Sequence, residues 1–196
     1  MDNREGQTSG MGQKVRWQLS LVVAAVLVVL GLAGWPALRV HLQSAAVLDL
    51  VGNTPVPFLL RRFVREPIEV RDLNLPLASG TVRARLYTPL QMANAPSIVL
   101  LHGVHHMGID EPRLETFATA MAACGVQVLT PELSDIKDYR VGAGSIATIG
   151  ESAEWLTHSS GGQPVGVMGL SFSGGLSLLA AADPKYRPDI RFVVAV

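Results

Sequence analysis

The stretch PVGVMGLSFSGGLSLLAAA, residues 164–182, decides the fold that we predict for this chain. A short apolar run ends at Gly169, and small and apolar residues typical of a helix packed on a sheet follow Ser171. A buried strand that passes directly into a helix requires a sharp turn at the serine. Small residues two positions before and two positions after the serine relieve crowding there, and Gly169 and Ser173 occupy these positions.

Strands alternate with helices over the rest of residues 66–196. Two alternating runs, 68–73 and 82–87, flank a turn at 78–80 and predict an antiparallel pair with one polar face at the edge of a sheet. Uniformly apolar runs, typical of parallel strands covered on both faces, follow at 98–101, 126–129, 165–168 and 192–196. Helices are expected near 112–123, 145–158 and 174–182. The order predicts a three-layer α/β fold whose first strands are antiparallel and whose later strands are parallel.

Residues 169–173, Gly-Leu-Ser-Phe-Ser, resemble the nucleophile elbow G-x-S-x-G of the α/β-hydrolase superfamily, which includes serine esterases, lipases and dienelactone hydrolases. Ser173 replaces the last glycine of the motif, and we expect the turn to tolerate this small side chain. The resemblance implies that Ser171 is the nucleophile, with Ser173 as a less favoured rival because it has no glycine two positions before it. A helix N-cap is the structural alternative for Ser171. Gly174 and Gly175 are expected to let the helix pack closely on the sheet.

A second motif lies upstream, where an apolar strand runs into residues 102–106, His-Gly-Val-His-His. It resembles the HG oxyanion loop that follows the third strand in this superfamily. An acyl-transfer intermediate carries negative charge on the former carbonyl oxygen, so two fixed backbone N–H groups must converge on that oxygen. The resemblance assigns them to Val104 and Phe172, with His102 and Gly103 as supporting residues of the loop.

The three histidines of this loop also raise the possibility of a metal site. His102 and His105 have the H-x-x-H spacing, but neither a helical HExxH nor a third ligand accompanies them, so we expect no metal and no cofactor. We expect His102 to hydrogen-bond the backbone, and His105 and His106 to line the substrate cleft. A dinucleotide site is not expected, because no G-x-G-x-x-G follows the first parallel strand.

The remaining polar residues have structural explanations. Asp110 and Glu111 precede Pro112 and are expected to cap the next helix. Glu151 and Glu154 are expected to face solvent on a helix, and Asp135, Asp138 and Tyr139 are expected on a loop at the rim of the cleft. Cys124, the single cysteine, is expected to be a buried free thiol.

Residues 19–38, LSLVVAAVLVVLGLAGWPAL, contain no charged residue. A helix of this length spans about 30 Å, the thickness of the hydrocarbon core of a bilayer. Trp17 and Trp35 bracket the run at positions suited to the two interfaces. We predict a transmembrane helix over 17–38. A cleaved signal peptide is the rival interpretation, but the apolar run is longer than the usual signal-peptide core and no A-x-A site follows closely.

The predicted organisation has four parts. An N-terminal tail covers 1–16, the membrane helix 17–38, a juxtamembrane linker 39–65 and the α/β-hydrolase domain 66–196. Lys14 and Arg16 favour a cytoplasmic N-terminus and a domain outside the cytoplasm, although Arg39 and later arginines reduce the asymmetry. In the linker, PFLLRRFVR has the pattern of a basic amphipathic segment, which suits either a membrane surface or packing on the domain.

Sixteen Lys and Arg balance sixteen Asp and Glu, so no overall charge attracts nucleic acid. The partners that we expect are a lipid bilayer, through residues 17–38, and a small-molecule acyl substrate.

The superfamily places an Asp or Glu and then a His after its nucleophile. Asp183 and Asp189 follow Ser171, but neither occupies the usual place of the acid, and no histidine follows at all. We therefore assign no catalytic acid and no base. An apolar run also reaches Val196 with no turn after it, so we expect the sheet to be incomplete at the C-terminus and the chain to be part of a longer protein.

The favoured function is a membrane-anchored serine hydrolase that cleaves an ester, thioester or similar acyl bond through an acyl-enzyme on Ser171. We expect activity in the full-length form and none in this fragment alone. Acyl transfer to an acceptor other than water would use the same residues. The alternative is a non-catalytic binding module of the same fold, or an inactive fragment.

Overall fold

The computed structural model describes residues 8–65, 67–140 and 142–196, and these form two compact units that divide between Leu42 and Gln43. Helix α1 (Thr8–Val51) supplies the first unit, and its residues from Gln43 onward belong to the second. The predicted tail is thus helical from Thr8, while residues 1–7 lie outside the described part of the chain. The helix also continues past the predicted span, through the first part of the predicted linker.

From residue 16 to residue 51, α1 is long and apolar enough to cross a membrane by length and composition. No other helix in the described ranges has both properties. The apolar side chains of residues 17–40 are exposed, and Trp17 (68%) and Trp35 (45%) are among them. This helix therefore has no protein core of its own to cover its apolar surface.

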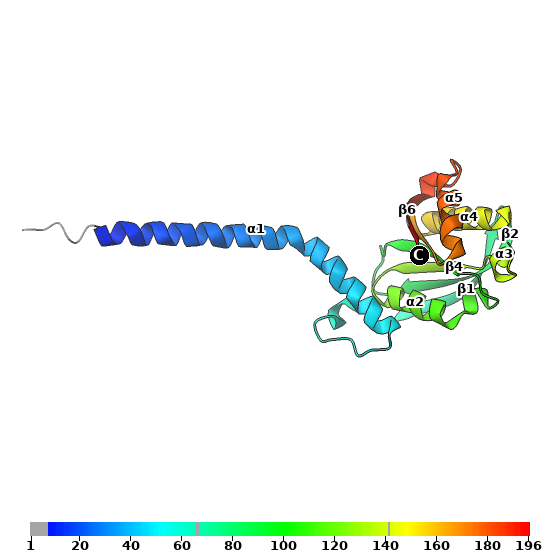
Figure 1. Cartoon of the computed structure of the whole chain (residues 1–196), viewed down its shortest axis with the longest axis horizontal. Coiled ribbons are helices and arrows are strands. Elements are labelled where there is room, and N and C mark those ends of the chain that lie inside the picture. The colour runs from blue at the N-terminus through cyan, green and yellow to red at the C-terminus, as the bar shows by residue number, and fades with distance from the viewer. Residues whose placement is uncertain (1–7, 66, 141) are drawn as a thin grey trace, which may run out of the picture. The chain divides into compact units, whose positions relative to one another are not determined.

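The second unit is built on a six-stranded sheet in the order β1-β2-β4-β3-β5-β6 (Figure 1). Its strands are β1 (Ile68–Leu77), β2 (Gly80–Pro89), β3 (Ser97–Leu101), β4 (Gln127–Pro131), β5 (Val165–Gly169) and β6 (Ile190–Ala195). Strands β1, β2 and β4 pair antiparallel, and β4, β3, β5 and β6 pair parallel. This confirms the predicted arrangement of antiparallel first strands followed by parallel ones.

Helices cover both faces of the sheet, as Figure 1 shows. The helices of the second unit are α2 (Pro112–Ala123), α3 (Ser134–Lys137), α4 (Ala143–Ser159) and α5 (Phe172–Ala182), with 3-10 turns η1 (Arg61–Phe63), η2 (Gly108–Asp110) and η3 (Arg187–Asp189). One buried cluster joins α2 to the sheet, and a larger one joins α3, α4 and α5 to the opposite face. The three predicted layers are therefore present.

Strand β3 shows why its sequence is apolar throughout. Ile98 and Leu100 belong to the cluster under α2, whereas Val99 and Leu101 belong to the cluster under α4 and α5. Successive side chains of a strand point to opposite faces, so a strand covered on both sides needs apolar residues at every position.

Two predictions about buried residues were wrong. Tyr87 alternates with the apolar residues Val82, Ala84 and Leu86 and was therefore expected on the polar face of β2. It is fully buried in the cluster under α2, because that helix covers this end of the strand. Glu151, expected to face solvent, is 6% exposed on α4 and accepts hydrogen bonds from the backbone N and the Oγ of Ser79 at 2.9 and 2.7 Å. The β1–β2 turn therefore packs against a helix that we predicted to be solvated there.

Candidate active site

Ser171 lies in the tight turn between β5 and α5. Its backbone has φ 57° and ψ −127°, in a region that residues other than glycine rarely adopt. Its N–H donates to the carbonyl of Val196 at 2.6 Å, and its carbonyl accepts from Gly174 N at 3.0 Å. The side chain is exposed, and within the described residues its hydroxyl makes no hydrogen bond, including no N-cap bond. The turn therefore presents a free hydroxyl.

Glycines make this turn possible. A methyl group at Gly169 would lie 2.5 Å from backbone atoms of Ser173 and Gly174, closer than any real contact. At Gly174 it would lie 3.0 Å from the Cβ of Ala195, so this glycine lets α5 approach the sheet. Gly175 does not, contrary to our prediction, because it is exposed and nothing lies within 4 Å of its Cβ position.

Ser173, the rival nucleophile, is fully buried. Its hydroxyl donates to the carbonyl of Leu170 at 2.8 Å, which closes the turn from inside. A buried hydroxyl that is engaged by the backbone does not meet a substrate, so only Ser171 of the two serines is accessible.

The loop after β3 lies against Ser171. A methyl group at Gly103 would be 3.4 Å from the Cβ of Ser171 and 3.3 Å from the carbonyl oxygen of Leu170. The two motifs that the sequence places far apart are therefore neighbours in space. Parallel strands β3 and β5 pair directly, with Leu101 opposite Gly169, which explains the proximity.

His102 fixes the start of this loop. The ring is 1% exposed, its Nε2 accepts a hydrogen bond from the N–H of Leu133 at 2.9 Å, and its Nδ1 lies 2.8 Å from the carbonyl oxygen of Gly103. Since Nε2 accepts, Nδ1 carries the proton and donates to Gly103. Burial lowers the pKa of His102, which favours this neutral form. The predicted backbone-bonding role of His102 is confirmed.

Of the predicted oxyanion donors, Val104 lines the same cleft as Ser171, and Phe172 directly follows Ser171 in the chain. His102 holds the carbonyl of Gly103, and in a trans peptide the N–H of Val104 points the opposite way from that carbonyl. Phe172 is the first residue of α5, so its N–H has no partner within the helix. Both N–H groups therefore remain candidates for binding an oxyanion.

A cleft of about 420 Å³ adjoins Ser171. Its apolar lining comes from residues of the loop after β3, of α2 and of the turn, namely Val104, Leu114, Phe117 and Leu170, and its polar lining includes Glu111, Arg113 and His105. His106, predicted to line the cleft, is exposed and outside this lining, and its ring packs at 4.6 Å from that of His105. The cleft suits a small, largely apolar group next to the serine.

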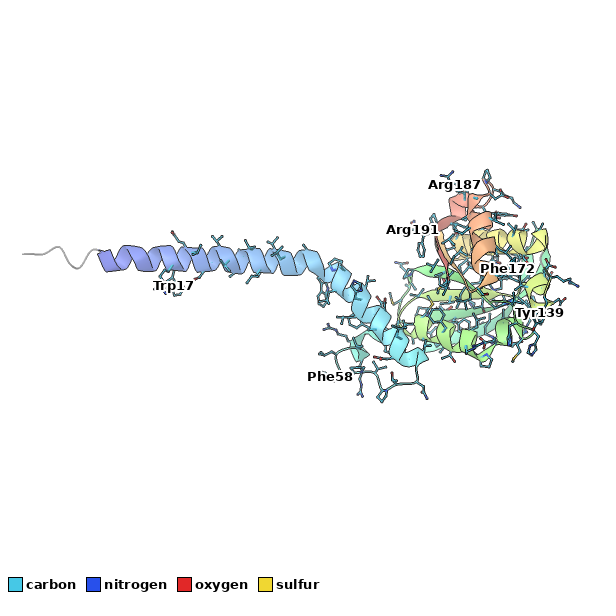
Figure 2. All side chains as sticks on the ribbon, in the orientation of Figure 1. Trp17, Phe58, Tyr139, Phe172, Arg187 and Arg191 are labelled. Atoms are coloured by element: carbon cyan, nitrogen blue, oxygen red, sulfur yellow. The ribbon has the colours of Figure 1, made fainter. Side chains whose placement is uncertain are left out.

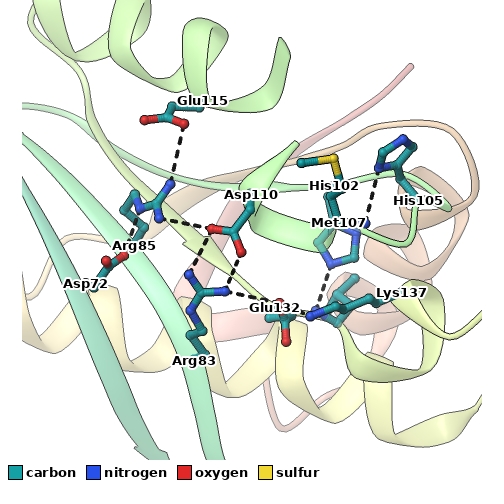
Figure 3. Close-up of polar contacts among 11 residues, drawn as sticks. Asp72, Arg83, Arg85, His102, His105, Met107, Asp110, Glu115, Glu132 and Lys137 are labelled. Atoms are coloured by element: carbon teal, nitrogen blue, oxygen red, sulfur yellow. Dashed lines mark hydrogen bonds and ion pairs between the residues drawn. The ribbon is translucent and has the colours of Figure 1, made fainter. Parts of the chain in front are cut away.

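A charged network that the sequence did not predict holds the far end of the loop (Figure 3). Asp110 receives two hydrogen bonds from Arg83, at 2.5 and 2.8 Å, and one from Arg85 at 3.1 Å. The hydrogen bonds from Arg83 keep the pKa of Asp110 below its usual value. Our prediction that Asp110 caps α2 was wrong, because only Glu111 does so, through Leu114 N at 2.9 Å. In the sequence, this network could have been inferred from Arg83 and Arg85, which occupy alternate positions of β2.

Comparisons with known proteins bear on the fold. No family model matches the sequence, and no curated protein does. Solved structures do match. Dienelactone hydrolase from Anabaena variabilis is 19% identical (TM-score 0.56), with 66% of this chain and 63% of that chain covered. An α/β serine hydrolase without lid from Xanthomonas campestris is 18% identical (TM-score 0.52), with 66% and 62% covered.

Brefeldin A esterase, a bacterial homologue of human hormone-sensitive lipase, is 17% identical (TM-score 0.54), with 79% of this chain and 47% of that chain covered. The chain has the α/β-hydrolase fold. It spans about half to just under two thirds of the length of these solved structures. The fold that the two motifs implied is thereby confirmed.

Within this part of an α/β-hydrolase fold, no described histidine hydrogen-bonds Ser171. Both ring nitrogens of His102 are engaged by the backbone, and Nδ1 of His105 accepts from Met107 N at 3.3 Å. Asp135 and Asp138, on and just after α3, and exposed Tyr139 are not among the residues that line the cleft. The candidate site of the α/β-hydrolase fold therefore consists of Ser171, the loop after β3 and the apolar cleft.

Cys124 lies outside this site. It is buried, and burial raises the pKa of its thiol to about 11, so the sulfur is protonated at neutral pH. This agrees with the predicted role in packing.

Proposed function

We propose that the native protein is a membrane-anchored serine hydrolase that cleaves an ester, thioester or similar acyl bond through an acyl-enzyme on Ser171. The observation that carries this proposal is the exposed Ser171 hydroxyl, held in a positive-φ turn at the end of β5 and beside the cleft. The esterases and hydrolases among the similar solved structures support the same reaction class.

In the proposed reaction the Ser171 oxygen attacks the carbonyl carbon of the substrate and gives up its proton. When the tetrahedral intermediate collapses to an ester of Ser171, the bond to the leaving group breaks and the proton departs with it as an alcohol or thiol. The N–H groups of Val104 and Phe172 stabilise the oxyanion. Water then hydrolyses the acyl-enzyme. The apolar walls of the cleft, Leu114 and Phe117 among them, favour a substrate with an apolar acyl or alcohol group.

Helix α1 supports the anchoring part of the proposal by its length and apolar surface. We place residues 17–38 across the bilayer, the N-terminus in the cytoplasm, and the α/β-hydrolase fold outside it. Protease added to intact cells should then degrade the second unit. Its survival, together with degradation in lysed cells, would reverse the orientation.

A serine-directed fluorophosphonate tests the nucleophile in the native protein. The wild type and Ser173→Ala should be labelled, whereas Ser171→Ala should lose labelling, because the probe bonds only to an activated, accessible hydroxyl. Ser173→Ala is the matched control, because the hydroxyl of Ser173 lies two residues further along the chain and is buried. Undiminished labelling of folded Ser171→Ala would overturn the proposal.

A non-catalytic binding module is the second candidate. It is favoured by one observation, that the Ser171 hydroxyl has no histidine partner within the described ranges. A folded native protein that shows neither labelling nor esterase activity would support the module and contradict the hydrolase.

A further inference from the structure

The turn before η1 exposes two large apolar side chains. Phe58 is 84% exposed and Leu59 is 70% exposed, while their neighbours Leu60 and Phe63 are 8% and 7% exposed. Figure 2 shows Phe58 projecting away from the folded unit, well separated from Phe172 beside the candidate site. The segment therefore packs on the domain with one set of apolar residues and presents a second set outward.

Backbone hydrogen bonds hold the turn that exposes Phe58 and Leu59. Leu60 N and Arg61 N both donate to the carbonyl of Pro57, at 2.8 and 3.2 Å, and Phe63 N donates to the carbonyl of Leu60 at 2.9 Å. Arg65 N then donates to the carbonyl of Ala123, at the end of α2, at 2.5 Å. Phe58 and Leu59 are thus held outward by a closed turn whose next residues are anchored in the core.

Positive charge adjoins the exposed pair. Arg61 and Arg62 follow after the buried Leu60 and are exposed, and residues 50–65 contain no Asp or Glu. Apolar side chains that protrude next to arginines match the surface of an anionic bilayer, where acyl chains lie under negatively charged headgroups. A protein partner with an acidic rim is the alternative occupant.

Chain connectivity favours the bilayer. The second unit begins at Gln43, whose side-chain amide donates to the carbonyl of Cys124, and Ala46 is fully buried. Only residues 39–42 separate this unit from the proposed span, a helical rise of about 7 Å. A folded unit tethered so closely must place one of its surfaces at the headgroups.

The exposed turn is within reach of that surface. Residues 39–51 are helical and extend for about 20 Å. The seven residues 52–58 can extend over about 24 Å, so Phe58 can return to the level of the headgroups.

We propose that residues 57–62 dock on an anionic lipid surface, with Phe58 and Leu59 inserted among the lipids and Arg61 and Arg62 at the lipid phosphates. This inference rests on the membrane anchor in the proposed function, and it does not depend on the hydrolase activity. Docking would hold the second unit in one orientation on the membrane.

Site-directed spin labelling of the full chain tests this surface. The background is Cys124→Ala, which removes the single cysteine, and the label is attached at Leu59→Cys. Glu154→Cys, at an exposed position of α4, is the matched control. In vesicles of phosphatidylcholine and phosphatidylglycerol, the label at 59 should be reached by oxygen and shielded from a water-soluble nickel complex, and the label at 154 should show the reverse.

Equal access of the nickel complex to both labels would overturn the proposal. Shielding of the label at 59 from oxygen as well as nickel would also overturn it, in favour of a protein contact. An alkaline wash separates failure of docking from failure of the anchor. If the chain stays in the vesicles while the label at 59 faces water, only docking fails; if the wash removes the chain, the anchor fails too.

The charge component has its own test. The double substitution Arg61→Gln with Arg62→Gln should move the label at 59 toward water in these vesicles. With both arginines present, the label at 59 should lie less deeply in vesicles of phosphatidylcholine alone. Unchanged depth in both comparisons would contradict the role of the arginines.

Discussion

Arg83 and Asp110 form a bidentate ion pair, with Nη1 to Oδ2 at 2.5 Å and Nη2 to Oδ1 at 2.8 Å. Asp110 ends η2, at the close of the loop that His102 begins. The loop is therefore held at one end by a buried histidine and at the other by an arginine from β2. Gly103, where an added methyl group would lie 3.4 Å from the Cβ of Ser171, lies between these two attachments.

Asp110→Asn should disturb this loop more than it disturbs the fold. Both partners are about 40% exposed, so the loss of stability should be about 1 kcal/mol or less. Displacement of a donor by about 1 Å can lower a rate about 100-fold, so phosphonate labelling of Ser171 should slow by more than the stability loss explains. Asp72→Asn is the control, because Asp72 pairs with Arg85 from β1 and not from the loop. Equal labelling rates in both variants would contradict a positioning role for Asp110.

Acidification should destabilise the fold through His102. The buried ring has a lowered pKa, whereas the unfolded ring titrates near its ordinary pKa of about 6.5, so between these values the unfolded state binds more protons. The contribution of His102 is thus complete above its ordinary pKa and declines as the pH falls through it. His102→Gln should cost about 2 kcal/mol at neutral pH and show a smaller change in stability between about pH 5 and about pH 8. Urea unfolding at several pH values measures both, and parallel curves would contradict this assignment.

Gly169→Ala and Gly175→Ala should have opposite effects. The added methyl group at 169 would meet fixed backbone at 2.5 Å, which should cost about 3 kcal/mol or more. At 175 it meets nothing within 4 Å and lies inside α5, where alanine is favoured over glycine by about 0.5 to 1 kcal/mol. Thermal unfolding of the two variants gives the comparison. A tolerated Gly169→Ala would mean that the turn is looser than described.

Glu151→Gln should weaken the attachment of the β1–β2 turn to α4. Burial raises the pKa of Glu151, but hydrogen bonds from Ser79 and Lys185 outweigh it and leave the pKa lowered. The carboxylate therefore stabilises the fold above the ordinary carboxyl pKa, and this contribution is lost as the pH falls through the lowered pKa. We expect a cost of about 1 to 2 kcal/mol at neutral pH, and hydrogen exchange should become faster at Ser79. Glu154→Gln, at an exposed position on the same helix, should change neither quantity.

The sequence predicted what depends on local pattern. The apolar runs that became β3, β4 and β5 are buried at nearly every position, as predicted for strands covered on both faces. The run that became β6 was predicted to be covered in the same way, and this was wrong, because β6 lies at the edge of the sheet and its residues are half-buried or exposed. The helix after Ser171 begins at Phe172, two residues before the predicted start. The proximity of His102 and Ser171 was predicted only through the resemblance to a known fold, because spacing along the chain does not specify which strands pair.

Two of the errors concern contacts between distant segments. Glu151 and Ser79 are 72 residues apart, and Asp110 and Arg83 are 27 apart. Each carboxylate has the sequence context of a solvated or capping residue, and only the packed sheet brings its partner near. We predicted that Gly175, like Gly174, lets α5 pack closely on the sheet. Adjacent residues of a helix point about 100° apart, so the close contact at Gly174 does not extend to Gly175.

The hydrogen bond from Ser171 N to the carbonyl of Val196 also sets an order of events during translation. The ribosome adds residue 196 about 25 residues after the serine, which at about 5 to 20 residues per second takes roughly 1 to 5 seconds. By then the apolar helix and all six strands of the sheet have already been synthesised. The serine's backbone is therefore locked late, after the chain has had time to engage a membrane.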